Sequence, residues 1–148
     1  DLFRRHGITT LVTSCPICLR VFREEYALEG VEVLHHSEYI LRLMRQGRLS
    51  VKYSAATFTY HDPCELGRGS GIYDEPRAVI EAVGSSVANT AINDAQQLTI
   101  AEGVAHELDE TGAETVVTSC PLCKKAIMRG SKRRVADLSE IVAENLGR

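Results

Sequence analysis

A short motif that occurs twice constrains the fold of this chain more than any other feature. Thr-Ser-Cys-Pro-Ile-Cys at positions 13–18 returns as Thr-Ser-Cys-Pro-Leu-Cys at positions 118–123. The similarity extends upstream at the same spacing, where Gly7, Thr10 and Val12 correspond to Gly112, Thr115 and Val117. A duplication of this kind predicts two similar strand–helix units, each with a Cys-Pro-x-Cys sequence at its turn.

The size and charge of the chain restrict its class. Its 148 residues suffice to bury a core as one domain, residues 1–148, and 44% hydrophobic with 25% charged residues is ordinary for a globular protein. The absence of Trp and the net charge of −3 argue against a nucleic-acid partner. No apolar run approaches the roughly 20 residues that span a bilayer, so we expect no transmembrane segment. Because the chain begins at Asp1 without Met, we interpret it as a fragment of a longer protein.

Short β-branched or apolar runs alternate with helical patterns along the chain. We predict strands at 8–12, 31–34, 57–60 and 115–118. We predict helices at 16–26, 37–46, 75–83, 93–111 and 121–128, with a last helix that ends near Gly147. The glycine-rich stretch 67–71 is predicted to be a loop, and 83–90 has no informative pattern. This alternation predicts an α/β fold with a mainly parallel sheet flanked by helices.

Five cysteines carry the chemistry of the chain, and four of them belong to the repeated motif. They are Cys15, Cys18, Cys64, Cys120 and Cys123. Each cysteine site follows a predicted strand, and open α/β sheets place their functional sites at the carboxyl ends of the strands. An odd number of cysteines favours a reducing compartment over a set of disulfides, so we expect a cytoplasmic location.

The Cys-Pro-x-Cys sequence suits thiolate chemistry. A cysteine at the start of a helix lies near free N–H groups and the positive end of the helix dipole, which both favour the thiolate. Three interpretations remain open at this point: an iron–sulfur site, a zinc site and a metal-free dithiol redox pair. A zinc site would take four thiolates, and the candidates are Cys15, Cys18, Cys120 and Cys123. Duplicated pairs favour a metal, because a thioredoxin-like site usually needs only one pair.

Three motifs together resemble a known family. They are Cys-Pro-x-Cys after Val-Thr-Ser, His-Asp-Pro-Cys-Glu-Leu-Gly-Arg at 61–68, and Tyr73-x-x-Pro76-Arg77. This combination is similar to the cysteine-rich CCG domain, and the resemblance covers nearly the whole chain. That domain occurs in a cysteine-rich component of heterodisulfide reductase and in the iron–sulfur subunits of glycolate oxidase, lactate utilisation and anaerobic glycerol-3-phosphate dehydrogenase systems.

The resemblance implies ligands, a cofactor and partners. Cys64 with Cys120 and Cys123 would bind a cluster in a second repeat, residues 51–148, whereas Cys15 and Cys18 would close a first repeat that ends near residue 50. The implied cofactor is a [4Fe–4S] cluster of the conventional or the non-cubane type. The implied role is an oxidoreductase subunit or domain that relays electrons between a flavoprotein dehydrogenase and a quinone or disulfide acceptor. Other iron–sulfur subunits would accompany it in the cytoplasm or at the inner face of the membrane. The alternatives are a zinc-binding structural module and a metal-free dithiol domain.

The chain departs from the family motif in one respect, because it contains no Cys-Cys-Gly. Only 55 residues separate Cys64 from Cys120, where the family motif needs roughly seventy. The shortfall falls at Gly84-Ser85-Ser86, which resembles the end of a Cys-Cys-Gly-Gly-Ser segment. We expect a cysteine-bearing loop to be missing from the sequence between about Val83 and Ser86; the alternative is a chain that has lost the pair.

Several other residues are weaker candidates. His61 is a candidate hydrogen-bond donor to a cluster or substrate. His35 and His36 follow a predicted strand, and one of them is expected to face the same sheet edge without acting as a metal ligand. Six basic residues between Lys124 and Arg134 would suit an acidic redox partner, but a solvated helix end is the more common explanation.

Overall fold

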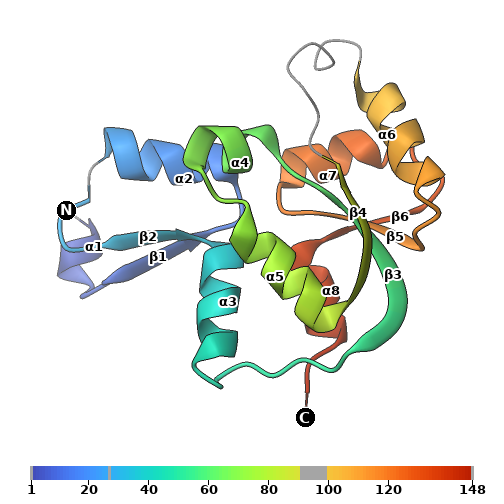
Figure 1. Ribbon diagram of the computed structural model, residues 1–148. Helices are drawn as coiled ribbons and strands as arrows, with labels where there is room; N and C mark the ends of the chain where they lie inside the picture. Colours follow the sequence, from blue (N-terminus) through green and yellow to red (C-terminus); the bar gives the residue numbers. More distant parts are fainter. Residues whose placement is uncertain (1, 27, 91–99, 148) are drawn as a thin grey trace.

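The computed structural model describes residues 2–26, 28–90 and 100–147 and shows an α/β architecture (Figure 1). The strands are β1 Thr10–Thr13, β2 Glu32–His35, β3 Ser54–His61, β4 Gly84–Thr90, β5 Thr115–Thr118 and β6 Arg134–Asp137. The helices are α1 Leu2–Arg5, α2 Pro16–Arg20, α3 His36–Arg45, α4 Cys64–Ser70, α5 Asp74–Val83, α6 Ile100–Glu110, α7 Pro121–Ile127 and α8 Leu138–Glu144. A π-helical turn, η1 Val21–Glu25, continues α2. No described helix is long and apolar enough to cross a membrane.

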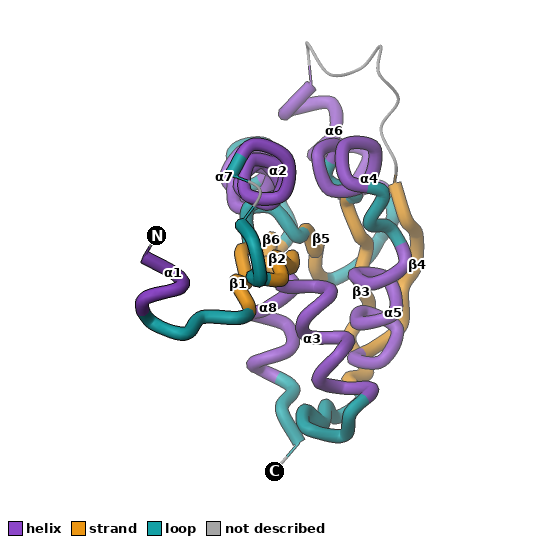
Figure 2. The backbone as a smooth tube through the Cα atoms, turned by 90° about the vertical axis from the view of Figure 1, so that its left-hand side faces the viewer, coloured by secondary structure: helices purple, strands orange, loops and turns teal. Residues whose placement is uncertain are grey.

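All paired strands among these elements run parallel, in two sheets. The larger sheet has the order β4-β3-β5-β6, and the smaller sheet is the pair β1-β2. In both views α3, α5 and α8 lie below the level at which α2, α4 and α7 are found (Figures 1 and 2). The predicted parallel α/β fold is therefore confirmed.

The core lies on both faces of the larger sheet. The alternation along β5 shows this, because Val117 packs in a cluster with α3, α5 and α8, whereas Val116 packs in a second cluster with α6 and α7. Both side chains are fully buried. A third cluster, built by Leu19, Val33, Leu66 and Ile72, joins α2 and α4 to β2. The packing of α2 against α4 connects the helix that carries Cys18 with the helix that begins at Cys64.

The repeated motif corresponds to a repeated unit of structure. The first unit is β1-α2-β2-α3 and the second is β5-α7-β6-α8, and in each unit the two strands pair in parallel. The register is the same in both, since Thr13 pairs with His35 and Thr118 pairs with Asp137. His35 and Asp137 each cap the helix that follows with a capping box. The predicted duplication of a strand–helix unit is confirmed and extends to a second strand and helix.

Some local predictions were wrong. Residues 67–70, predicted to be a loop, belong to α4, and only Gly71 leaves the helical conformation, with φ of +70°. Leu66 and Gly67 are buried against neighbouring elements, so packing stabilises this helix despite its glycines. The strands β4 and β6 were not predicted, because each is short of apolar residues: β4 is largely polar, and β6 has only Val135 and Ala136 between charged residues. The cap predicted for α6 near Asp94 lies outside the described residues.

Candidate functional site

Three thiols lie at the carboxyl edge of the larger sheet. Cys64 is the first residue of α4 and follows β3, whereas Cys120 caps α7 and follows β5. Because β3 and β5 pair with His61 opposite Thr118, the loops after these strands begin side by side. The charge of Cys64 raises the pKa of Cys123, which shows that the third thiol is electrostatically close to the other motif. The structure thus brings Cys64 to the edge that holds the second Cys-Pro-x-Cys motif.

The thiols of Cys120 and Cys123 interact with each other. The Cys123 S–H donates to Cys120 and lowers the pKa of Cys120 to about 6; burial opposes this shift, and the backbone N–H groups of Cys123 and Leu122 reinforce it. The same hydrogen bond raises the pKa of Cys123, and burial adds to the effect. Cys120 is therefore the thiolate of the pair near neutral pH, and Cys123 is the proton donor.

The first thiol pair has the same arrangement in a more open position. Cys15 caps α2, and its backbone N–H donates to Thr13 Oγ1 over 3.2 Å. A hydrogen bond that the Cys18 S–H donates to Cys15 raises the pKa of Cys18, and burial contributes less. Cys18 is exposed, whereas its counterpart Cys123 is partly buried. The two pairs are thus similar in geometry and different in solvent access.

Buried polar side chains lie at the end of β3 and just after it, beside the strand that leads to the second thiol pair. Tyr60, which is fully buried, donates from its hydroxyl to Ser119 Oγ over 3.2 Å. His61 is buried, its Nδ1 has no hydrogen-bond partner among the described residues, and burial lowers its pKa to about 4. Burial raises the pKa of Asp62, and the neighbouring Arg77 opposes that shift. The position of His61 is consistent with a role at this edge, and that role stays a prediction.

Two histidines lie between the repeated units. His35 and His36 are both buried, and their ring centroids are 4.3 Å apart. His36 Nε2 lies 3.4 Å from Asp137 Oδ1 of the second unit. Burial lowers the pKa of His35, and the backbone groups of Ser14 and Ser119, one from each unit, oppose this shift. Our sequence-based reasoning did not predict this junction; the signal was that Ser37 and Glu38 match Ser139 and Glu140 in the two capping boxes.

The cysteine side chains at this edge are chemically suited to an iron–sulfur cluster, because such clusters are bound by thiolates. A complete ligand sphere is not preformed: among the residues that the structure describes, no group of three Cys, His, Asp or Glu side chains is close enough to hold a metal ion. All five cysteines are free thiols. Cys64, Cys120 and Cys123 are the thiols of this edge that could hold such a cluster.

The basic residues of 124–134 are partly neutralised. Lys124 pairs with Glu140 at 2.7 Å, and Arg134 pairs with Glu144. The segment is a short helix, a turn and the start of β6 rather than one basic helix end. Ion pairing of this kind weakens the case for a docking surface at this segment.

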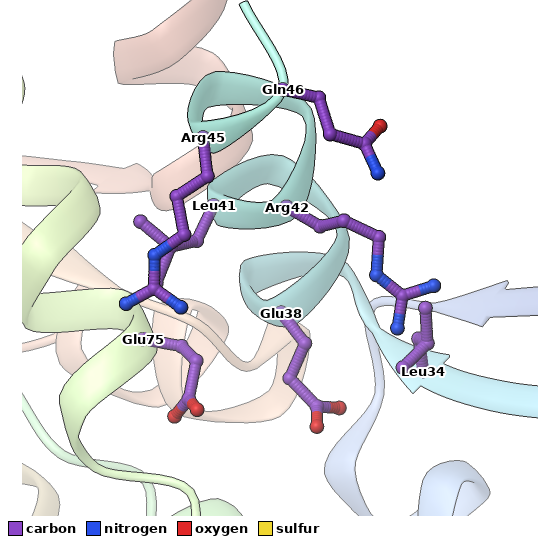
Figure 3. A pocket seen from close by; sticks show the side chains of 7 residues that line it. All are labelled: Leu34, Glu38, Leu41, Arg42, Arg45, Gln46 and Glu75. Atoms are coloured by element: carbon purple, nitrogen blue, oxygen red, sulfur yellow. The ribbon is translucent and has the colours of Figure 1, made fainter.

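A pocket on the surface of α3 lies apart from the thiols (Figure 3). It is lined by Leu34, Glu38, Leu41, Arg42, Arg45, Gln46 and Glu75. Its side chains include charges of both signs, and two of them already have partners: Arg42 pairs with Glu32, and Glu38 with Arg23. This pocket therefore presents no consistent charge to a ligand.

Comparison with known proteins finds similarity to a cysteine-rich domain family and to proteins named as a ferredoxin, an oxidoreductase and a reductase component. Residues 58–97 and 84–128 match the family model of the cysteine-rich domain CCG. The chain is 32% identical over 178 aligned residues to a probable membrane-anchored ferredoxin of Chromohalobacter salexigens, covering 99% of this chain and 26% of that protein. It is 28% identical to an EtfAB:quinone oxidoreductase of Syntrophomonas wolfei, covering 94% of this chain and 23% of that protein. One component of the dihydromethanophenazine:CoB–CoM heterodisulfide reductase of Methanosarcina mazei is also 28% identical, with 99% and 43% covered.

The lengths of these matches carry further information. The chain spans less than half of each of these three relatives. The alignments run over 168, 178 and 176 residues, although the chain has only 148. Each relative therefore contains residues within the aligned region that have no counterpart here.

Proposed function

Because this chain contains the cysteine-rich domain of the CCG family, we propose that it is an iron–sulfur electron-transfer module of an oxidoreductase. The observation that carries the proposal is the position of Cys64 beside Cys120 and Cys123, at one edge of a parallel sheet. Thiols from two separate motifs lie at that edge, and cysteines are the ligands that iron–sulfur clusters take. The names of the relatives, among them a ferredoxin and two oxidoreductases, support the same role.

The finer assignment follows the chemistry of the thiols. We assign Cys64, Cys120 and Cys123 to one [4Fe–4S] cluster, and Cys15 and Cys18 to a second site. A bound cluster would supply one-electron chemistry. The chain would contribute thiolate ligands and buried polar groups that tune the potential, and the candidates are Tyr60, His61 and Ser119, which are buried at the ends of β3 and β5. A flavoprotein as electron donor and a quinone or disulfide as acceptor belong to this proposal, as does a location in the cytoplasm or at the inner face of the membrane.

The ligand set also requires the Cys-Cys pair that the sequence lacks. We assign the residues that are present in the relatives and absent here to the segment between about Val83 and Ser86. This position is supported by the two family matches, which overlap at 84–97. Peptide sequencing of the natural polypeptide across residues 83–86 tests this assignment: additional residues with a Cys-Cys pair would support it, and an uninterrupted Val83-Gly84-Ser85-Ser86 would show that the pair is truly absent there.

Anaerobic reconstitution of the natural polypeptide with ferrous iron and sulfide tests the proposed function. We expect iron and acid-labile sulfide to bind in equal amounts, with an electron paramagnetic resonance signal after reduction. Cys64→Ser should lower the bound iron, whereas Ser70→Ala, at the other end of the same helix, should leave it unchanged. Binding of zinc without sulfide would overturn the proposal in favour of a structural zinc module.

A metal-free dithiol function is the second candidate. It rests on the hydrogen bond between the Cys120 and Cys123 thiols, which holds one sulfur as a thiolate beside its partner. Titration of the reduced chain against dithiothreitol redox buffers would then show a reversible Cys120–Cys123 disulfide. If no such couple is found, this second function is excluded.

A further inference from the structure

The two Cys-Pro-x-Cys motifs are nearly identical up to their second thiol and differ directly after it. The next two residues are Leu19 and Arg20 in the first unit, and Lys124 and Lys125 in the second. Lys124 pairs with Glu140 within its own unit. Leu19 and Arg20 instead contact α4, the helix that begins at Cys64. The first motif is therefore joined at these two positions to a helix that carries a thiol of the other site.

Leu19 forms the apolar part of this contact. It belongs to the same cluster as Leu66 of α4, and both side chains are fully buried. Leu66 follows Cys64 by two residues, so α2 packs on the first turn of α4, next to the thiol. A lysine, as the second unit has at the equivalent position, could not be buried there without a partner for its charge.

Arg20 forms the polar part of the same contact. Its Nη1 donates to Glu65 Oε2 over 2.7 Å, and Glu65 is the residue directly after Cys64. The Arg20 Nε also lies 3.6 Å from Glu24 Oε2 in its own unit. Gly69 leaves room for this pair, because a Cβ there would lie 3.0 Å from Glu65 Oε2 and 3.4 Å from Arg20 Cδ. The ion pair therefore lies along one side of α4, with its acceptor one residue from the thiol.

The ring of Tyr73 holds α4 from another side. A Cβ at Gly67 would clash with that ring, so the ring packs directly on the backbone of the helix. Gly67 and Gly69 are about 200° apart around the helix, which places α4 between the Tyr73 ring and the ion pair. A helix of seven residues has little stability of its own. The contacts on its two sides therefore decide where its first residue, Cys64, is placed.

We propose that Arg20 is a positioning residue for Cys64, so that the helix of the first Cys-Pro-x-Cys motif places a thiol of the second site. Arg20 acts through Glu65, and Leu19 supplies the apolar support beside it. This role gives the first unit a task at the other thiol site in addition to its own cysteines. It holds for any group that the thiols bind, and it shares with the proposed function only the placement of Cys64 beside the second thiol pair.

Cross-linking of thiols measures the position of Cys64. The reduced natural polypeptide is treated with dibromobimane, a short reagent that joins two thiols, and the linked peptides are quantified by mass spectrometry. The readout is the yield of links from Cys64 to either thiol of the second pair, divided by the yield of the Cys120–Cys123 link in the same sample. We expect Arg20→Met to lower this ratio by about 2–5-fold, the effect of a partly exposed ion pair.

Two comparisons separate positioning from general stability and from charge. Arg42→Met removes an ion pair of similar exposure, with Glu32, between α3 and β2, and should leave the ratio unchanged. In a Glu65→Gln background the partner is already absent, so Arg20→Met should have no further effect there. Arg20→Lys keeps the charge and the apolar stem and should restore most of the ratio. If Arg20→Met does not fold, Arg20→Gln takes its place in the same comparisons.

The outcomes distinguish this inference from the proposed function. A parent protein that gives no link from Cys64 to the second pair would contradict the placement on which both depend. A clear link in the parent that Arg20→Met leaves unchanged would overturn the positioning role alone. An effect that persists in the Glu65→Gln background, or an equal effect in Arg42→Met, would also overturn it, because the charge itself or general stability would then be the cause.

Discussion

Arg77 Nη2 lies 2.5 Å from Asp62 Oδ2, and this ion pair joins the two motifs that flank Cys64. Asp62 belongs to His-Asp-Pro-Cys and is 5% exposed, whereas Arg77 belongs to Tyr-x-x-Pro-Arg and is 31% exposed. The Arg77 guanidinium also lies 5.5 Å from the centre of the Tyr73 ring. The pair anchors the loop before Cys64 to α5 and so helps to position that thiol relative to the sheet.

Removal of this ion pair should destabilise the chain. Arg77→Met leaves the buried Asp62 carboxylate without its partner, and we expect the free energy of unfolding to fall by about 2 kcal/mol. This value lies below that of fully buried pairs because a third of Arg77 is in solvent. Urea denaturation measures the change. Arg42→Met removes an exposed pair with Glu32 and serves as the matched control, for which we expect little effect. Equal losses in both variants would contradict a special role for Asp62.

Cys120 should ionise at a much lower pH than an ordinary thiol does. Its pKa of about 6 depends first on the Cys123 S–H, so alkylation of Cys120 in the metal-free chain should reach half its maximal rate near pH 6. In Cys123→Ala that donor is lost, and the midpoint should move upward toward the ordinary value of 9.0. Cys123→Ser retains a donor and should stay closer to the parent. A midpoint that is the same in all three proteins would exclude the thiol–thiol hydrogen bond as its cause.

Burial of His61 should make the chain less stable in mild acid. The pKa of His61 falls from 6.5 when unfolded to about 4 when folded, so the unfolded state binds the proton more tightly. The contribution of the neutral ring is therefore present above 6.5 and is lost as the pH falls toward 4. From about pH 7 to about pH 5 the free energy of unfolding should drop by about 2 kcal/mol on account of this residue.

The test compares the parent with His61→Gln by denaturation at both pH values. The glutamine does not titrate in this range, so its variant should lose less stability between them, whatever its stability at neutral pH. His35, with a folded pKa of about 3, contributes in the same direction in both proteins and cancels in the comparison. An identical loss in both would show that His61 is not buried in its neutral form.

Substitution by alanine at two helical glycines should change the stability of the chain in opposite directions. A Cβ at Gly67 would lie 2.4 Å from Tyr73 Cε1, so Gly67→Ala should displace the Tyr73 ring and cost about 1–3 kcal/mol of stability. At Gly103 in α6, no atom of the described residues outside the helix itself lies within 4 Å of the added carbon, and alanine should stabilise the helix by about 0.5–1 kcal/mol. Thermal unfolding distinguishes the signs. Stabilisation in both would show that Tyr73 does not pack on Gly67.

Local signals in the sequence were sufficient for much of the fold. Pro16 and Pro121 after β-branched runs predicted where two helices begin, because proline suits the first turn of a helix. The duplicated motif predicted equivalent strand–helix units. Local patterns failed at β4 and β6, where short segments with few apolar residues form strands by pairing with β3 and β5.

The sequence by itself determined the chemical type of the site: five thiols, four of them in equivalent turns, each after a strand. Only the tertiary structure decided which groups meet. The pairing of β3 with β5 brings Cys64 beside Cys123, across more than fifty intervening residues. His35 and His36 are buried where the two units approach, and His36 reaches Asp137 of the second unit. Such contacts depend on sheet order and on the packing between units, which involve residues distant in the chain and leave no periodic signal in it.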